Sequence, residues 1–338
     1  MVAFPDPRRR HPFHMHDMIL GQPAFVAEAL RRTAAADGSS FLGRPRRLVL
    51  TGCGTSFHAA MYGARVFQEV MPSVPVLAIH AYDLAYGPFV PANATVLGVS
   101  HSGSTPTTNR ALRRAHWWGC RTLAVCGLAG SAMERVADRT LVIGSTHDRS
   151  WANTMSYTTQ LTAFAALASQ SRSNVGPSID ASLRGLARSL ETTLGCESHV
   201  RRLATRVAQA ARVTFLGSDL DEITALEAAL KIRETSSVPA SGYHTEQFLR
   251  GNGRRGRGVR PRQNPITRDA SNPSADSLHR AAAVPRVLRG PRTAREPGHH
   301  ADGYSPTSCG GGGALSLTPT SGGTPTTVFA SVPFRRSS

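Results

Sequence analysis

Three charged residues, Glu227, Lys231 and Glu234, are spaced four and three positions apart, which places them on one face of a predicted helix. A carboxylate can move a proton, and a cation beside it can stabilise the negative charge that develops. Solvated ion pairs on exposed helices show the same spacing. Lys231 is the only lysine among 39 basic residues, and a surface charge in such a chain is expected to be arginine. The composition therefore tilts the interpretation toward a functional site, and a solvated surface pair stays open as the alternative.

Two loops rich in glycine and hydroxyl groups, residues 52–56 (GCGTS) and 100–105 (SHSGST), each follow a predicted strand and precede a predicted helix. In an open parallel sheet, ligands bind at the carboxyl ends of strands, where helix N-termini offer free N–H groups. The loops therefore predict a phosphate site, although helix caps use the same residue types.

The elements that must position these residues alternate along the chain. Short apolar runs predict strands at 47–52, 76–80, 94–100, 121–126 and 140–143, and helices are expected at 56–70, 105–118 and 157–169. This alternation predicts an α/β fold with a doubly wound parallel sheet, a flavodoxin-like three-layer sandwich. The pattern restarts with a helix at 199–211, a strand at 213–217 and a helix at 221–236, which predicts a second, truncated α/β domain.

Composition changes abruptly near residue 251. The chain has 338 residues and a formal net charge of +17, and residues 252–338 hold 13 arginines against four acids, with 12 glycines and 10 prolines. A segment so rich in arginine, glycine and proline has few apolar side chains to bury, which predicts a disordered tail. A shifted reading frame would explain the change, whereas RNA binding by the RGRG at 255–258 is disfavoured because no aromatic residues are interleaved. Nucleic acid is therefore not an expected partner.

The expected domain organisation follows from these boundaries. Residues 1–40 form an N-terminal segment with an entry helix, 41–172 the first domain, 173–196 a linker, 197–251 the start of the second domain, and 252–338 the tail.

Several classes of protein are excluded by the sequence. No run of about 18 apolar residues exists, so no membrane span is expected. The five cysteines form no CxxC pair and the N-terminus has no signal-peptide core, which together predict a reducing, cytoplasmic location. The histidines at 11, 14 and 16 lack partners in a metal framework, so we expect no metal and no cofactor. Trp117 and Trp118 are expected to pack in the core or against another subunit.

Five motifs occur in an order that is typical of one known family. They are residues 18–23 (MILGQP), 52–56 (GCGTS), 99–105 (VSHSGST), 152–161 (ANTMSYTTQL) and 226–234 (LEAALKIRE). They resemble the signatures of the sugar isomerase (SIS) domain family, and within it the isomerase half of the glutamine–fructose-6-phosphate transaminases. The resemblance covers about residues 14–251.

The resemblance implies roles for individual residues. Glu234 stands at the family's base position, and Lys231 stands at its active-site lysine. By the resemblance, the two loops would hold a sugar phosphate through Ser56, Ser100, His101, Ser102 and Thr105, with Gly54, Thr55 and Gly103 as further candidates. Thr154 lies in the segment that resembles the family's STKAYTTQL, and His101 stands where the family usually has glutamine. Arg250 replaces the histidine credited with opening the sugar ring, and arginine cannot shuttle protons near neutral pH.

The function implied by the resemblance is that of an aldose–ketose sugar-phosphate isomerase, or an isomerising transaminase-like unit of amino sugar metabolism. Its ligand would be a sugar phosphate of the fructose 6-phosphate or glucosamine 6-phosphate class, and a homodimer is expected. The alternative is a non-catalytic sensor of phosphosugars, or an inactive truncated fragment.

Overall fold

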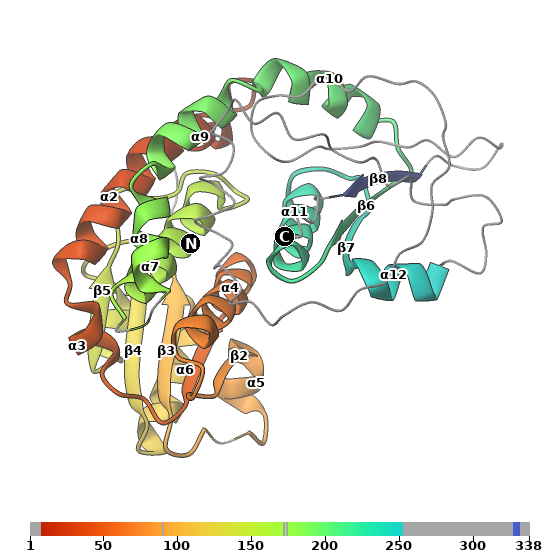
Figure 1. Ribbon diagram of the computed structural model, residues 1–338. Helices are drawn as coiled ribbons and strands as arrows, with labels where there is room; N and C mark the ends of the chain where they lie inside the picture. The colour runs from red at the N-terminus through yellow and green to blue at the C-terminus, as the bar shows by residue number, and fades with distance from the viewer. Residues whose placement is uncertain (1–7, 90, 172, 174, 253–326, 332–338) are drawn as a thin grey trace, which may run out of the picture.

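A five-stranded parallel sheet forms the centre of the first domain. The computed structural model describes residues 8–89, 91–171, 173, 175–252 and 327–331 (Figure 1). The sheet has the order β2-β1-β3-β4-β5. Its strands are β1 (Leu48–Gly52), β2 (Val76–His80), β3 (Thr95–Ser100), β4 (Arg121–Cys126) and β5 (Arg139–Val142). Each begins and ends within one residue of its predicted range.

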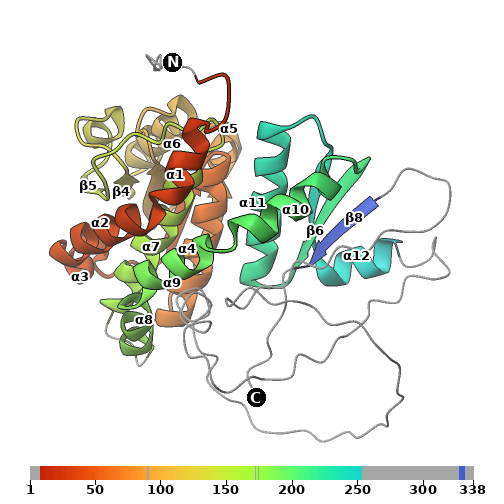
Figure 2. The ribbon, with the colours of Figure 1, turned by 90° about the horizontal axis from the view of Figure 1, so that it is seen from above.

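Helices cover both faces of this sheet (Figures 1 and 2). Successive residues of a strand point to opposite faces. Leu48 and Leu50 therefore enter the core under α4 (Thr55–Val70) and α7 (Thr154–Ser169), and Val49 enters the core under α5 (Ala81–Tyr86) and α6 (Pro106–Trp117). The predicted doubly wound, three-layer α/β fold is confirmed.

Further helices extend the layer that contains α7. They are α1 (His14–Leu20), α2 (Gln22–Ala35), α3 (Gly38–Leu42), α8 (Gly176–Leu183) and α9 (Leu186–Leu194), while a 3-10 turn, η1 (Ala132–Arg135), precedes β5. Here α2 packs along both α7 and α9, and α8 packs against α7. The segment 173–196, expected as a linker, thus contains two helices whose Ile179, Leu183 and Leu186 are buried.

A second parallel sheet follows α10 (Glu197–Val207). It has the order β7-β6-β8 and consists of β6 (Arg212–Gly217), β7 (Ala240–His244) and β8 (Thr327–Ser331). The helix α11 (Leu220–Thr235) packs on β6 and β7, and α12 (Thr245–Asn252) follows β7. β8 belongs to the segment 252–338 that the composition predicts to be disordered; apart from Asn252 and β8, that prediction lies outside the described residues.

The second unit repeats the local geometry of the first. Gly52 and Gly217 each end a strand, and a Cβ on either would clash with the backbone of the helix that follows. Two residues later, Gly54 (φ 53°, ψ −129°) and Asp219 (φ 57°, ψ −122°) adopt nearly the same conformation. The chain therefore turns from β6 into α11 as it turns from β1 into α4.

Among the described residues, no helix combines the length and the hydrophobicity that a membrane crossing requires.

Candidate functional site

The two predicted phosphate loops lie side by side at the carboxyl edge of the first sheet. β1 pairs with both β2 and β3, so the strand order reverses at β1 and β3, and ligands of open α/β sheets bind at such a point. Thr108 Oγ1, in the first turn of α6 after the second loop, lies 3.7 Å from Cys53 Sγ of the first loop. The structure therefore brings the two groups of candidate ligands to one edge of the sheet.

The hydroxyl groups of the second loop largely contact one another. Ser100 Oγ and Thr105 Oγ1 are 2.9 Å apart. Ser102 Oγ accepts hydrogen bonds from the backbone N–H of Ser104 at 3.3 Å and from its hydroxyl at 2.9 Å. Gly103 adopts a positive φ of 61°, and Asn109 Nδ2 donates to its carbonyl at 3.2 Å. The loop is thus shaped in advance, and its internal contacts fit either a phosphate cradle or a helix cap.

The side chain of His101, the second residue of this loop, is buried. Its Nε2 accepts a hydrogen bond from the backbone N–H of Asp148 at 3.2 Å, and a Cβ on Gly127 would clash with its ring. Burial lowers the pKa of His101, while the charge of Asp148 acts in the opposite direction. A neutral imidazole packed in this way supports the loop from below, which argues against direct donation to a phosphate.

The first loop leads into α4, where two neighbouring hydroxyl residues face different partners. Ser56 Oγ accepts a hydrogen bond from Gln160 Nε2 of α7 at 3.1 Å. Thr55 Oγ1 donates to Glu227 Oε1 of α11 at 3.0 Å. The start of α4 is therefore held by one helix of its own domain and by one helix of the second unit.

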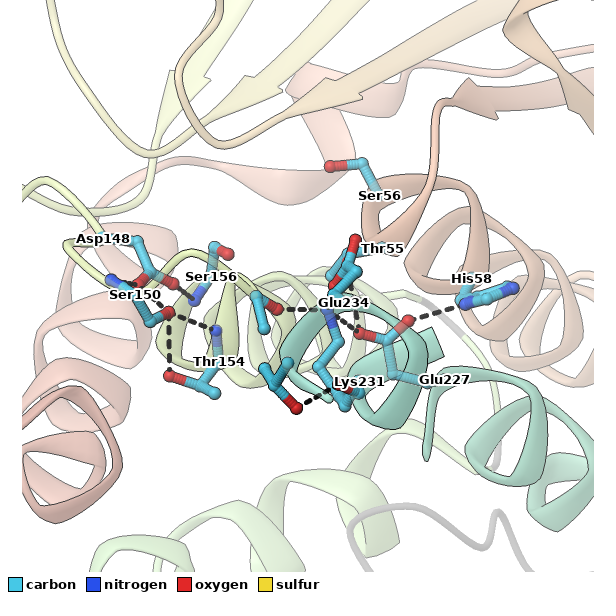
Figure 3. A network of polar contacts seen from close by, with 12 residues as sticks. Thr55, Ser56, His58, Asp148, Ser150, Thr154, Ser156, Glu227, Lys231 and Glu234 are labelled. Atoms are coloured by element: carbon cyan, nitrogen blue, oxygen red, sulfur yellow. Dashed lines mark hydrogen bonds and ion pairs between the residues drawn. The ribbon is translucent and has the colours of Figure 1, made fainter. Parts of the chain in front are cut away.

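The predicted charged face of α11 docks against this start of α4 (Figure 3). Lys231 Nζ lies 2.8 Å from Thr55 Oγ1, 3.1 Å from Glu227 Oε1 and 2.7 Å from Glu234 Oε2. It also donates a short hydrogen bond to the carbonyl oxygen of Ala152, in the loop before α7. The three residues singled out by their spacing therefore form one cluster with Thr55.

Burial separates this cluster from an ordinary surface ion pair. The side chain of Glu227 is 5% exposed, that of Lys231 18% and that of Glu234 28%. An exposed pair of the same spacing on a helix surface would be worth only a few tenths of a kcal/mol. Glu234 is the most open of the three, so it is the carboxylate that a ligand can reach.

His58, one turn into α4, also belongs to this cluster, although the spacing of the charged residues does not predict it. Its Nδ1 lies 2.6 Å from Glu227 Oε2, so each oxygen of the buried carboxylate has a partner. His58 follows Thr55 by three residues on the same helix. The hydroxyl pattern that predicts the phosphate loop ends before it, so that pattern does not indicate a role for this histidine.

Asp148 is a second functional candidate that the sequence analysis missed. Its buried carboxylate accepts hydrogen bonds from Ser150 N and Oγ at 2.9 and 2.5 Å and from Ser156 N at 2.9 Å. Ser150 Oγ in turn accepts from Thr154 N at 3.0 Å. Figure 3 shows this group beside the Lys231 cluster, and Thr154 belongs to it. Asp148 thereby fixes the loop whose Ala152 carbonyl binds Lys231.

Two tyrosines bury their hydroxyl groups next to the cluster. Burial, and secondarily the charges of Glu227 and Tyr62, raises the pKa of Tyr157. Burial also raises the pKa of Tyr62. Both shifts indicate that little water surrounds the buried side of the cluster.

Arg250 is not brought into this cluster by any described contact. Its Nε pairs with Glu246 Oε1 at 2.7 Å on the exposed surface of α12. No group of three metal-ligating side chains occurs in the part of the chain that the structure describes.

Comparisons with known proteins bear on the domain that carries these residues. Residues 41–170 match the SIS domain, so this part of the chain is an SIS domain. The chain is strongly similar to the isomerase domain of glutamine–fructose-6-phosphate aminotransferase (isomerizing). It is 28% identical over 240 residues to that enzyme from Pyrococcus horikoshii and 33% identical over 214 residues to that from Symbiobacterium thermophilum.

These matches cover 69% and 61% of this chain but only 40% and 35% of the two enzymes. Among solved structures, the C-terminal domain of the glucosamine–fructose-6-phosphate aminotransferase from Francisella tularensis superposes with a TM-score of 0.66 at 22% identity. That superposition covers 74% of this chain and 73% of the other, and it shows a shared fold.

Proposed function

Starting from the SIS domain at residues 41–170, we propose that this protein binds a sugar phosphate and interconverts its aldose and ketose forms. The substrate class is that of fructose 6-phosphate and glucosamine 6-phosphate, and fructose 6-phosphate is the sugar that the names of the similar enzymes contain. The proposal covers the isomerase chemistry alone, because this chain spans about two fifths of the length of those enzymes.

One observation supports this proposal above the others. Lys231, the only lysine of the chain, extends from α11 to the first turn of α4 and binds Thr55 there, beside the loop expected to hold phosphate. A catalytic face that must meet a bound substrate has to lie at such a junction. A lysine that only increases solubility is expected at the exposed surface, not partly buried against another domain.

The roles follow from exposure and from the contacts. The Ser and Thr loops after β1 and β3 would hold the phosphate. Glu234 would take a proton from C2 of the aldose, or from C1 of the ketose, and return it to the neighbouring carbon. Lys231 would stabilise the enediolate formed in between. Glu227, held by Thr55 and His58, would position Lys231 rather than touch the substrate.

A sensor that binds the phosphosugar without turnover is the second candidate. Every described contact of the Lys231 ammonium is internal, and Arg250 pairs with Glu246 on the surface instead of reaching the cluster. A fully paired cluster of this kind can join two domains around a ligand without performing chemistry.

Proton exchange in heavy water separates the two candidates. The whole chain is incubated with fructose 6-phosphate in D2O, and deuterium incorporation at C1 is followed by NMR, which detects the enediolate even without net turnover. We expect exchange in the native protein and a loss of about 100-fold or more in Glu234→Gln.

The matched control is Glu246→Gln, which removes an exposed carboxylate from the neighbouring helix α12 and should leave exchange unchanged. Calorimetry with the same sugar checks that Glu234→Gln still binds it. Saturable binding without exchange in the native protein would assign the sensor function.

We further propose the domain division 1–40, 41–172, 173–196, 197–251 and 252–338, with 173–196 as a helical connection. The homodimer implied by the resemblance stays a prediction that sedimentation velocity would test, and the cytoplasmic location stays a prediction.

A further inference from the structure

The outer surface of α5 and α6 carries a cleft that the proposed reaction does not use. It has a volume of about 550 Å³ and is lined by Ala85, Tyr86, Arg110, Arg113, Arg114 and Trp117. These helices cover the face of the sheet opposite to α4 and α7. The loop at 100–105 precedes the first residue of α6, whereas the lining residues start one turn later and continue to the last residue of the helix. The cleft is therefore separate from the Lys231 cluster.

The charged groups of this cleft are all cationic. Three arginines and no acid line it, and among the described residues no carboxylate forms an ion pair with any of them. Arg114 Nη1 donates to the carbonyls of Leu84 at 2.9 Å and Gly87 at 2.7 Å, which fixes its guanidinium and ties α6 to the end of α5. Arg110 and Arg113 remain available, so the cleft favours an anionic ligand.

Two of the remaining lining residues, Tyr86 and Trp117, are aromatic and exposed. The guanidinium carbon of Arg110 lies 4.6 Å from the ring centroid of Tyr86, so these two groups are already stacked. Trp117 is 76% exposed, and its ring forms an edge-to-face pair with that of Trp118, with ring centroids 4.8 Å apart. Of the two expected positions, the core is thereby excluded for Trp117, and packing against another subunit stays a prediction. An indole with most of its surface exposed is suited to stack a planar ring.

We propose that this cleft binds a nucleoside phosphate, with its base on the face of Trp117 and its phosphate between Arg110 and Arg113. A volume of this size lies within the range of small-molecule sites, about 300–1,000 Å³. Bidentate pairing with phosphate is the chemistry to which guanidinium groups are best suited. The same chemistry would recognise a free nucleotide or a nucleotide within a single strand.

A second copy of this chain is a poorer occupant. A two-fold contact centred on this patch would place Arg110 and Arg113 against their own equivalents, and like charges facing each other weaken an interface.

Isothermal titration calorimetry of the whole chain tests the proposal with four probes: ADP, adenosine, pyrophosphate and a single-stranded tetranucleotide of deoxyadenosine. We expect ADP to bind saturably, and adenosine and pyrophosphate to bind about tenfold more weakly or not at all, because each lacks one half of the recognised chemistry. Trp117→Ala and Arg113→Gln should each weaken ADP about fivefold or more. Arg202→Gln, an exposed arginine of α10, is the matched control and should bind ADP as the native protein does.

The other possible results of these titrations each overturn or support a part of the proposal. Absence of ADP binding, or ADP binding that both cleft variants retain, would overturn the proposal. Pyrophosphate binding as tight as that of ADP would overturn the role of Trp117. If the tetranucleotide binds more tightly than ADP and this binding is lost in both cleft variants, the proposed recognition of base and phosphate is supported. The ligand is then a nucleotide within a single strand.

Discussion

At the scale of single residues, Lys231 is the side chain on which the junction between the two units depends. It neutralises Glu227, which is almost completely buried, and it connects α11 to Thr55 and Ala152. Removing one partner of a buried ion pair leaves an uncompensated charge, which costs far more than losing an exposed pair.

Replacement of Lys231 by methionine is therefore expected to destabilise the fold. Lys231→Met should lower the free energy of unfolding by about 3 kcal/mol in urea titrations. Arg201→Met, which breaks the exposed pair with Glu197, is the control and should cost about 0.5 kcal/mol or less. The double variant Lys231→Met with Glu227→Gln should recover most of the loss. If it is as unstable as the single variant, charge burial is not the cause.

His101 gives the first domain a dependence on pH. Burial lowers the pKa of this histidine in the folded state, against the opposing charge of Asp148 and with a smaller contribution from His147 in the same direction. In the unfolded chain this histidine binds a proton near pH 6.5, whereas in the folded chain it binds one only at a lower pH. The free energy of unfolding therefore decreases as the pH falls through about 6.5, and it stops decreasing below the folded pKa.

We expect His101→Gln to flatten this loss. Thermal unfolding midpoints of the two proteins are compared from pH 8 to pH 5, and the difference at pH 8 serves as the reference for packing alone. Identical slopes for the native protein and the variant would show that another group causes the loss.

At the scale of elements, the two copies of the strand–turn–helix unit share one unusual backbone conformation but place different residue types in it. Glycine occupies it in the first copy, at Gly54, and aspartate in the second, at Asp219. A positive φ combined with a ψ near −120° is unfavourable for any residue with a Cβ. The turn into α11 therefore carries strain that the turn into α4 avoids.

Asp219→Gly is expected to relieve this strain. It should raise the free energy of unfolding of the second unit by about 1 kcal/mol relative to Asp219→Ala. Both variants remove the weak pair with Arg65, so their comparison isolates the backbone. Gly54→Ala is the converse test. A Cβ there meets no atom within 4 Å, so any loss in stability reflects conformation alone. Equal stability of the two Asp219 variants would contradict the argument.

At the scale of the whole molecule, the two units differ in the size of their cores. The first has extensive apolar clusters on both faces of its sheet, whereas the described part of the second buries only Val213, Ala229 and Ala240 in its own cluster. Local opening requires less free energy where fewer apolar groups are buried.

Hydrogen exchange should reveal this difference. Amides of β1, β3 and β4 should exchange slowest, those of β6 and β7 should exchange faster, and α11 should become faster still in Lys231→Met. Mass spectrometry of peptic fragments measures all of these rates. Equal protection of β3 and β6 would show that the two units unfold as one.

Local patterns in the sequence were enough to define the first domain. Apolar runs located its strands, because a buried strand must be apolar over its own few residues. Helical spacing identified Glu227, Lys231 and Glu234 as one face, because the period of a helix is a local property. β7 was missed, since its sequence, ASGYH, has little apolar character.

Only the tertiary structure decided what that face meets. The contacts of Glu227 with Thr55 and His58 join residues 172 and 169 positions apart, and no local pattern encodes such a pairing. No local pattern distinguishes Asp148 from the other aspartates either. Only the fold buries it beside His101, to which its backbone N–H donates a hydrogen bond. The sequence by itself determined which side chains are equipped for chemistry. The packing of α11 on α4 determined which of them act together, because that packing sums many weak contacts over the whole chain.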